Sequence, residues 1–188
     1  MTDENLTDEK LITAAREGDQ NAFKELVRRH ESRVAATVIG MLGRCPEAED
    51  VGQETFIRFY NSLKKFRGES SVGTYLTRIA INLSLNELKR RKRGSLLFFQ
   101  KPPDEIYDIS DKKAERHLDE DKEMVQRAIQ KLERKFRSVV VLRLIDGYST
   151  EETAQILNIP VGTVLSRLSR AQQKLKELLT PYYLGDKR

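Results

Sequence analysis

The segment from Ser149 to Val164 constrains the fold more than any other part of the chain. Ser149, followed three residues later by Glu152, forms a capping box, which predicts that a helix begins there. Asn158 tolerates the left-handed backbone conformation that a tight turn needs. Val164 is the apolar residue expected to hold a second helix against the first. This spacing is typical of a helix-turn-helix, whose second helix enters the major groove of DNA.

Polar and basic side chains are predicted on the DNA-facing side of this unit. Arginine can bind guanine through two hydrogen bonds, which discriminates between bases by about 1–3 kcal/mol. Lys174 is expected to meet phosphate, which carries no sequence information. The predicted DNA-binding residues here are Thr150, Pro160, Thr163, Ser166, Arg167, Arg170 and Lys174. The alternative is a helical hairpin with a solvated basic face.

Apolar residues recur at three- and four-residue steps through most of the chain, so an all-α fold is predicted. Helices are expected up to Gly18, from Asp19 to Gly43, from Pro46 to Leu63 and from beyond Ser71 to Arg93. Asp19 is a good N-cap residue, and proline suits the first turn of a helix. The last of these helices carries a polar, increasingly basic outer stripe.

The helical pattern stops between Gly94 and about Lys122, where Pro102 and Pro103 adjoin. From Asp104 to Glu123, nine acidic residues stand against four basic ones. We therefore predict two small helical domains, residues 1–94 and 125–188, joined by an acidic flexible linker over residues 95–124. Fully extended, such a linker could span on the order of 90 Å.

Composition excludes several classes of function. The net charge of +5 permits a polyanionic partner. Cys45 is the only cysteine, so no internal disulfide framework exists, and with no membrane-length apolar run a cytoplasmic location without membrane insertion is expected. His30 and His117 with one cysteine make no convincing metal site. Neither a phosphate-binding glycine loop nor a nucleophile constellation is present, so no cofactor and no enzymatic activity are expected.

Three segments, in order and at the right spacing, resemble the extracytoplasmic-function (ECF) sigma factors of the sigma-70 family. Residues 46–60 resemble the polymerase-binding segment, and residues 66–82 resemble the promoter-melting segment. The chain from Arg137 onward, with Val161–Val164, resembles the second DNA-binding domain. The resemblance implies a bacterial protein that binds core RNA polymerase and recognises the −10 and −35 promoter elements. It also implies an anti-sigma factor as a candidate partner, which no residue of the chain identifies.

The resemblance assigns the first domain two surfaces. Asp50, Gln53 and Glu54 share a helix face at i, i+3 and i+4, and the family binds the clamp helices of the polymerase large subunit with this surface. The implied polymerase-binding residues are Asp50, Gln53, Glu54, Phe56 and Tyr60. An ordinary solvated acidic face is the alternative.

The second surface would bind the −10 element, which is partly single-stranded once opened. Capturing unstacked bases requires aromatic faces and a cationic track. The implied residues are Phe66, Arg67, Ser70, Ser71, Arg78, Asn82, Lys89, Arg90, Arg91, Lys92 and Arg93. Phe66 also fits the role of a core aromatic, as does Tyr75, and the basic run fits a solvated helix end.

The chain departs from the family pattern at four places. Family members commonly carry an aromatic at Val72, Trp at Tyr75, Lys or Arg at Leu165, and Pro before the stretch that starts at Glu133. Leu165 therefore removes an expected DNA contact. The rival functions are a free-standing helix-turn-helix regulator, which leaves residues 46–82 unexplained, and a protein-interaction adaptor, which leaves the basic recognition face unexplained.

Overall fold

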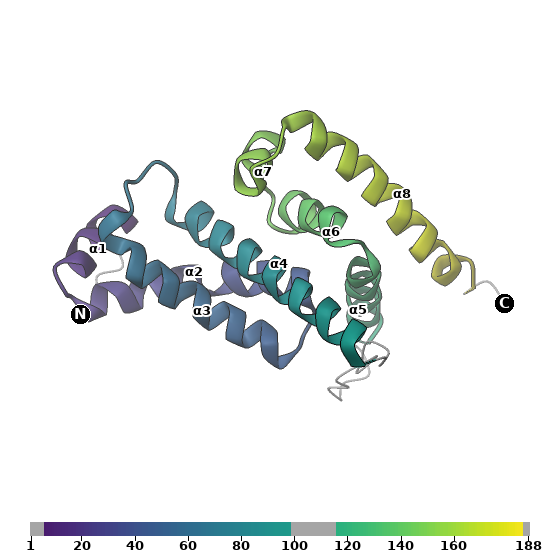
Figure 1. The fold of residues 1–188 in the computed structure, drawn as a ribbon, viewed down its shortest axis with the longest axis horizontal. Coiled ribbons are helices and arrows are strands. Elements are labelled where there is room, and N and C mark those ends of the chain that lie inside the picture. Colours follow the sequence, from purple (N-terminus) through teal and green to yellow (C-terminus); the bar gives the residue numbers. More distant parts are fainter. Residues whose placement is uncertain (1–5, 99–115, 186–188) are drawn as a thin grey trace.

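The chain folds into helices throughout residues 6–98 and 116–185, which the computed structural model describes (Figure 1). The N-terminal domain contains α1 (Asp8–Arg16), α2 (Gln20–Leu42), α3 (Pro46–Ser62), the short 3-10 helix η1 (Leu63–Lys65) and α4 (Val72–Phe98). The C-terminal domain contains α5 (Arg116–Lys131), α6 (Arg134–Val140), the π-turn η2 (Val141–Ile145), α7 (Thr150–Leu157) and α8 (Val161–Gly185). The predicted all-α class is confirmed for these residues.

Local chemistry sets several helix ends as the sequence predicts. The Asp19 carboxylate accepts hydrogen bonds from the backbone N–H groups of Asn21 (2.8 Å) and Ala22 (3.3 Å), which caps the start of α2. Gly43 ends α2 with φ at 81°, a left-handed value that glycine adopts without steric cost. Pro46 occupies the first turn of α3.

Helical structure extends further than predicted into both ends of the linker segment. α4 continues past Gly94 to Phe98, because a single glycine in a helix costs only about 1 kcal/mol. α5 begins at Arg116 rather than near Lys122. The rest of the predicted acidic linker, residues 99–115, lies outside the described residues.

The core of the N-terminal domain is built from the inner faces of α2, α3 and α4. Leu26, Met41, Phe59 and Leu76 are fully buried there. Phe59 is the centre of an aromatic cluster, with ring centroids 6.1 Å from Phe66 and 6.0 Å from Tyr75.

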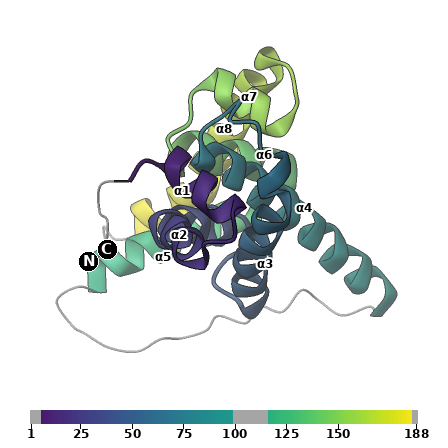
Figure 2. The ribbon, with the colours of Figure 1, turned by 90° about the vertical axis from the view of Figure 1, so that its left-hand side faces the viewer.

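The two domains pack directly against each other, which the sequence did not predict (Figures 1 and 2). α5 and η2 contact α2, while α6 and α7 contact α4. Gly40 marks a close approach between α2 and η2, since a Cβ atom at this position would lie 3.0 Å from Cγ2 of Val141. A larger residue at position 40 would therefore push the two helices apart.

Side chains of the C-terminal domain cap the carboxyl end of α2. The last four carbonyls of a helix lack partners within it. Gln126 Nε2 donates to the Ile39 carbonyl (2.7 Å), Gln130 Nε2 to that of Gly40 (2.9 Å), and Arg137 to that of Met41 (2.7 Å). Because α2 has no basic residue in its last turn, the Arg137 guanidinium supplies the positive charge that a helix C-terminus favours.

Candidate functional site

The helix-turn-helix forms as predicted. The Ser149 hydroxyl accepts a hydrogen bond from the Glu152 N–H (3.1 Å), and the Glu152 carboxylate accepts one from the Ser149 N–H (2.7 Å). The bond from the Ser149 N–H, helped by the Ser149 side chain, holds the pKa of the Glu152 carboxyl below its ordinary value. Asn158 ends α7 in the left-handed conformation, with φ at 51° and ψ at 54°. The capping box and the turn are therefore confirmed.

A small core fixes α8 against α7. Val139, Ala154 and Val164 are buried together, and Leu157, Ile159 and Leu168 pack around them. Since Val164 points inward, its neighbours on the opposite side of α8 must point to solvent. The start of α8 thus packs against α6 and α7, while its polar face is directed outward.

The predicted −35 residues differ in their surroundings. Pro160, Ser166 and Arg170 are exposed, whereas Thr150, Thr163 and Arg167 are half-buried. Lys174 is exposed but engaged, because its ammonium lies 3.2 Å from the Glu133 carboxylate and 5.3 Å from the centre of the Phe136 ring. Arg170 is therefore the arginine of this face that is most open to a ligand.

The outer face of α3 presents the predicted polymerase-binding residues together. Asp50 and Gln53 are exposed, and the Glu54 carboxylate binds Arg58 over 2.7 Å. Tyr60 is half-exposed, with its ring packed edge-on against Phe23, and Phe56 is half-buried against the core. Sequence reasoning missed Ile57, which is 54% exposed on this same face. Its position three residues after Glu54 and four after Gln53 was the signal that could have found it.

The residues predicted to bind single-stranded DNA differ in their exposure. Phe66 is only 8% exposed and packs edge-on against Tyr75 at 5.0 Å, so it occupies the core, the role that the sequence left open as an alternative. The Arg67 side chain, by contrast, is 84% exposed. Ser70 is half-buried, and the exposed Ser71 hydroxyl accepts from the Thr74 N–H (3.1 Å) at the start of α4.

Further along α4, Asn82 is exposed and Arg78 is half-buried. The residue before Arg78, Thr77, is fully buried beneath the C-terminal domain, where the Tyr148 hydroxyl donates to its Oγ1 over 2.9 Å. The packed C-terminal domain therefore contacts the predicted melting segment directly.

The basic run at residues 89–93 is partly neutralised. Glu87 accepts hydrogen bonds from Arg90 (2.7 Å) and Arg91 (3.1 Å), and these bonds hold the pKa of its carboxyl below the ordinary value. Arg91 also lies 3.2 Å from the Glu47 carboxylate. Lys89, Lys92 and Arg93 are exposed, and among the described residues no ion pair engages them. These three cations are the ones most accessible to phosphate.

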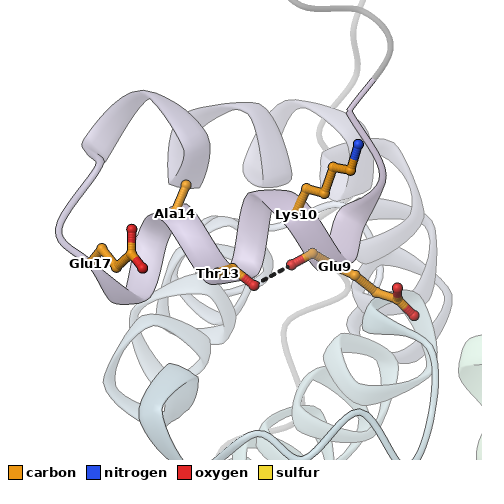
Figure 3. A pocket seen from close by; sticks show the side chains of 5 residues that line it. All are labelled: Glu9, Lys10, Thr13, Ala14 and Glu17. Carbon is orange, nitrogen blue, oxygen red and sulfur yellow. Dashed lines mark hydrogen bonds between the residues drawn. The ribbon is translucent and has the colours of Figure 1, made fainter.

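A surface hollow on α1 offers no comparable chemistry (Figure 3). It is lined by Glu9, Lys10, Thr13 and Ala14 of α1 and by Glu17, which directly follows the helix. Its one marked hydrogen bond joins the Thr13 hydroxyl to the Glu9 carbonyl over 2.9 Å. Within residues 6–98 and 116–185, no three His, Cys, Asp or Glu side chains gather where they could hold a metal ion. The candidate surfaces are the outer faces of α3, α4 and α8, where the predicted site residues lie.

Comparison with known proteins decides between the rival functions. Residues 26–94 match Sigma-70 region 2, and residues 122–175 match Sigma-70, region 4. The chain is 33% identical to the RNA polymerase sigma-H factor of Pseudomonas aeruginosa, over 93% of this chain and 94% of that protein. It is 35% identical to the ECF RNA polymerase sigma-E factor of Escherichia coli strain K12, over 95% and 97%. The chain belongs to the ECF sigma factors.

As an ECF sigma factor, the protein directs promoter recognition by RNA polymerase and is not itself an enzyme. The two matched regions lie in the two domains that the helices define. CnrH, solved in complex with the cytosolic domain of CnrY, has a similar structure, with a TM-score of 0.65 and 29% identity over 92% of this chain and 97% of CnrH. None of the described helices of this sigma factor is long and apolar enough to cross a bilayer.

Proposed function

We propose that the two domains divide promoter recognition between them, with α8 binding the −35 element as duplex and the outer face of α4 binding the −10 element. The observation that carries this proposal is the orientation of α8. Burial of Val164 turns Ser166 and Arg170 toward solvent on the first turns of a helix-turn-helix recognition helix. Residues at this position meet base edges in the major groove.

The N-terminal domain would hold single-stranded bases with exposed polar groups at the start of α4 and hold phosphates further along. Arg67, Ser71 and Asn82 are exposed near the melting segment. Lys89, Lys92 and Arg93 continue the track toward the end of α4. A row of exposed cations of this kind can follow a nucleic-acid backbone without reading its sequence. Phe66 would contribute a stacking face only after leaving the aromatic cluster.

The outer face of α3 would bind the clamp helices of the large subunit of core RNA polymerase. Its acidic and amide groups surround an exposed apolar residue, Ile57, beside Tyr60. Interfaces commonly place a few apolar or aromatic anchors inside a polar rim, and these anchors carry most of the binding energy. The outer face of α3 has both an apolar anchor and a polar rim.

The packed domains must separate before both promoter elements are bound. In the packed arrangement, Arg78 and Thr163 lie within about 55 Å of each other. This upper limit follows the chain from Arg78 to Thr77, crosses the Thr77–Tyr148 hydrogen bond and continues from Tyr148 to Thr163. It allows about 3.6 Å for each extended residue and about 1.5 Å for each helical one. By their names, the −10 and −35 elements are centred about 25 base pairs apart, or about 85 Å along straight duplex. The packed arrangement is therefore a state of the protein away from the promoter.

An anti-sigma factor is a further proposed partner. CnrH, which resembles this chain over nearly its whole length, was solved with the cytosolic domain of another protein, CnrY. A partner of this kind would act by binding one arrangement of the two domains more tightly than the other.

In vitro transcription with purified core polymerase tests the division of labour. We expect wild-type protein to give promoter-dependent transcripts. We also expect substitution of the −35 element to weaken the first complex between holoenzyme and promoter duplex more than substitution of the −10 element does. Failure to produce any promoter-dependent transcript on genomic templates, combined with duplex binding by the protein alone, would contradict the proposal.

A further inference from the structure

Two large apolar side chains face solvent at the start of the recognition helix. Leu165 is 54% exposed and Val161 is 41% exposed. Their spacing of four residues places both on one side of α8. Val164 and Ala171, on the side of the same helix that packs against α6 and α7, are fully buried. The exposure of Leu165 therefore does not follow from loose packing of α8.

Leu165 has no role in holding the domain together. The buried residues of the helix-turn-helix and the apolar residues packed around them do not include it. Leucine gains about 1.5–3 kcal/mol when it is fully buried, so an exposed leucine retains a driving force to contact another apolar group.

The position of Leu165 points to a base. It precedes Ser166, which is exposed, and lies five residues before Arg170 on the same helix. In the major groove, the C5-methyl of thymine is the apolar group, while the other base-edge groups are hydrogen-bond donors and acceptors that leucine cannot satisfy.

We propose that Leu165 makes the −35 contact specific for thymine, by packing against the C5-methyl group in the major groove. This inference rests on the proposed −35 role of α8. Leu165 would make an apolar contact where the Lys or Arg common in the family would make a hydrogen bond. The departure of this chain from the family pattern at position 165 would then help to determine which promoter sequence it recognises. Arg170 would continue to supply a polar contact from the next turns of the helix.

Replacing thymine with deoxyuridine tests the contact, because that change removes only the methyl group. Holoenzyme assembled from this protein and core polymerase is first used to select −35 sequences from a randomised promoter. Each thymine of the selected element is then replaced singly with deoxyuridine. We expect one position at which the change weakens binding of wild-type holoenzyme about four-fold, the factor for burying one methyl-sized group. With Leu165→Ala, the same change should have no effect.

Leu144→Ala is the matched control, because Leu144 is also 54% exposed but lies on η2, away from the recognition helix. It should keep the wild-type response to deoxyuridine. In a second selection, Leu165→Lys should change the preferred base at the sensitive position from thymine to guanine, since lysine binds the guanine edge.

The outcomes separate this inference from the proposed function. Selection of a −35 element with no thymine whose methyl distinguishes wild type from Leu165→Ala would overturn the inference alone. Equal weakening of Leu165→Ala on templates with and without a −35 element would also overturn it, because Leu165 would then contact protein. If holoenzyme selects no sequence at all, the proposed function fails and the inference fails with it.

Discussion

The Tyr148 hydroxyl donates a hydrogen bond to Oγ1 of Thr77 over 2.9 Å, joining residues that are 71 positions apart in the chain. Thr77 lies within the proposed melting segment, and Tyr148 directly precedes the N-cap of the helix-turn-helix. Both residues are buried. Because one contact joins two DNA-binding units, its strength affects how readily the domains separate for promoter binding.

Tyr148→Phe should loosen the packed arrangement. Removal of the hydroxyl leaves the buried Thr77 hydroxyl without this partner, at a cost of about 1–3 kcal/mol. Small-angle X-ray scattering should show a larger radius of gyration than for wild type. Tyr182→Phe removes a hydroxyl from a residue that is 54% exposed and should leave the radius unchanged. An unchanged radius in both variants would show that this hydrogen bond does not hold the domains.

Gly40→Ala should also favour separated domains. Its Cβ would lie 3.0 and 3.1 Å from the two methyl carbons of Val141, and overpacking of this kind costs about 1–3 kcal/mol. Gly94→Ala is matched to it, since both glycines are helical but Gly94 has no atom near enough to obstruct a Cβ. Formation of a promoter complex that engages both elements should be faster with Gly40→Ala than with wild type or Gly94→Ala. Slower formation of this complex would argue against separation as a required step.

Acid should strengthen the packing through Asp146. Burial raises the pKa of its carboxyl from 3.8 to about 6, against the opposing effects of the Thr37 hydrogen bond and the Arg33 charge, both from α2. The packed state thus binds the proton more tightly than the separated state. The contribution of Asp146 to the stability of the packed state is greatest below about pH 4 and is lost as pH rises through about 6.

Scattering measured between pH 5 and pH 7.5 should therefore show domains that separate more readily at the higher pH. Asp146→Asn keeps a neutral side chain at every pH, so it should remove this trend and hold the domains together at pH 7.5. A trend that persists in Asp146→Asn would assign the pH dependence to other groups.

Arg170→Ala should weaken −35 recognition while leaving core polymerase binding intact. Loss of a two-bond contact with guanine costs about 1–3 kcal/mol, which is roughly a 5- to 150-fold change in affinity. The measurement pairs holoenzyme binding to promoter DNA with pull-down of core polymerase. Lys131→Ala removes an exposed cation of the same domain and serves as the control. Equal loss of both activities in Arg170→Ala would indicate misfolding or a misassigned helix.

Ile57→Ala should weaken core polymerase binding by about 1–2 kcal/mol, the range for removing a partly exposed apolar anchor at an interface. Leu144→Ala, with the same exposure on the other domain, should bind core polymerase as wild type does. Competition with a reference sigma factor for limiting core enzyme measures the difference. Wild-type competition by Ile57→Ala would remove this residue from the proposed α3 surface.

The sequence by itself determined the capped helix ends and the helix-turn-helix. The Asp19 cap, the Ser149–Glu152 capping box and the left-handed Asn158 each depend on residues within a few positions of one another. Interactions of this range depend only on the local sequence, so they can be predicted without knowledge of the tertiary contacts. The family resemblance followed from such segments in order.

Only the tertiary structure decided the role of Phe66 and the exposure of Ile57. An aromatic ring suits both a base stack and a hydrophobic core, so residue type could not separate the two roles. Burial of Phe66 against Phe59 and Tyr75 favours the core. Likewise, an isoleucine in a helix is expected to be buried until its face is known.

The direct packing of the two domains was also decided by tertiary structure alone. Its contacts join residues far apart in the chain, as Arg137 joins Met41 across 96 positions and Asp146 joins Thr37 across 109. These inter-domain contacts depend on the close approach that Gly40 permits. They also depend on carbonyls at the end of α2 that lack partners within the helix and accept hydrogen bonds from the C-terminal domain. No local pattern encodes either condition, because both are properties of two complementary surfaces and not of one segment.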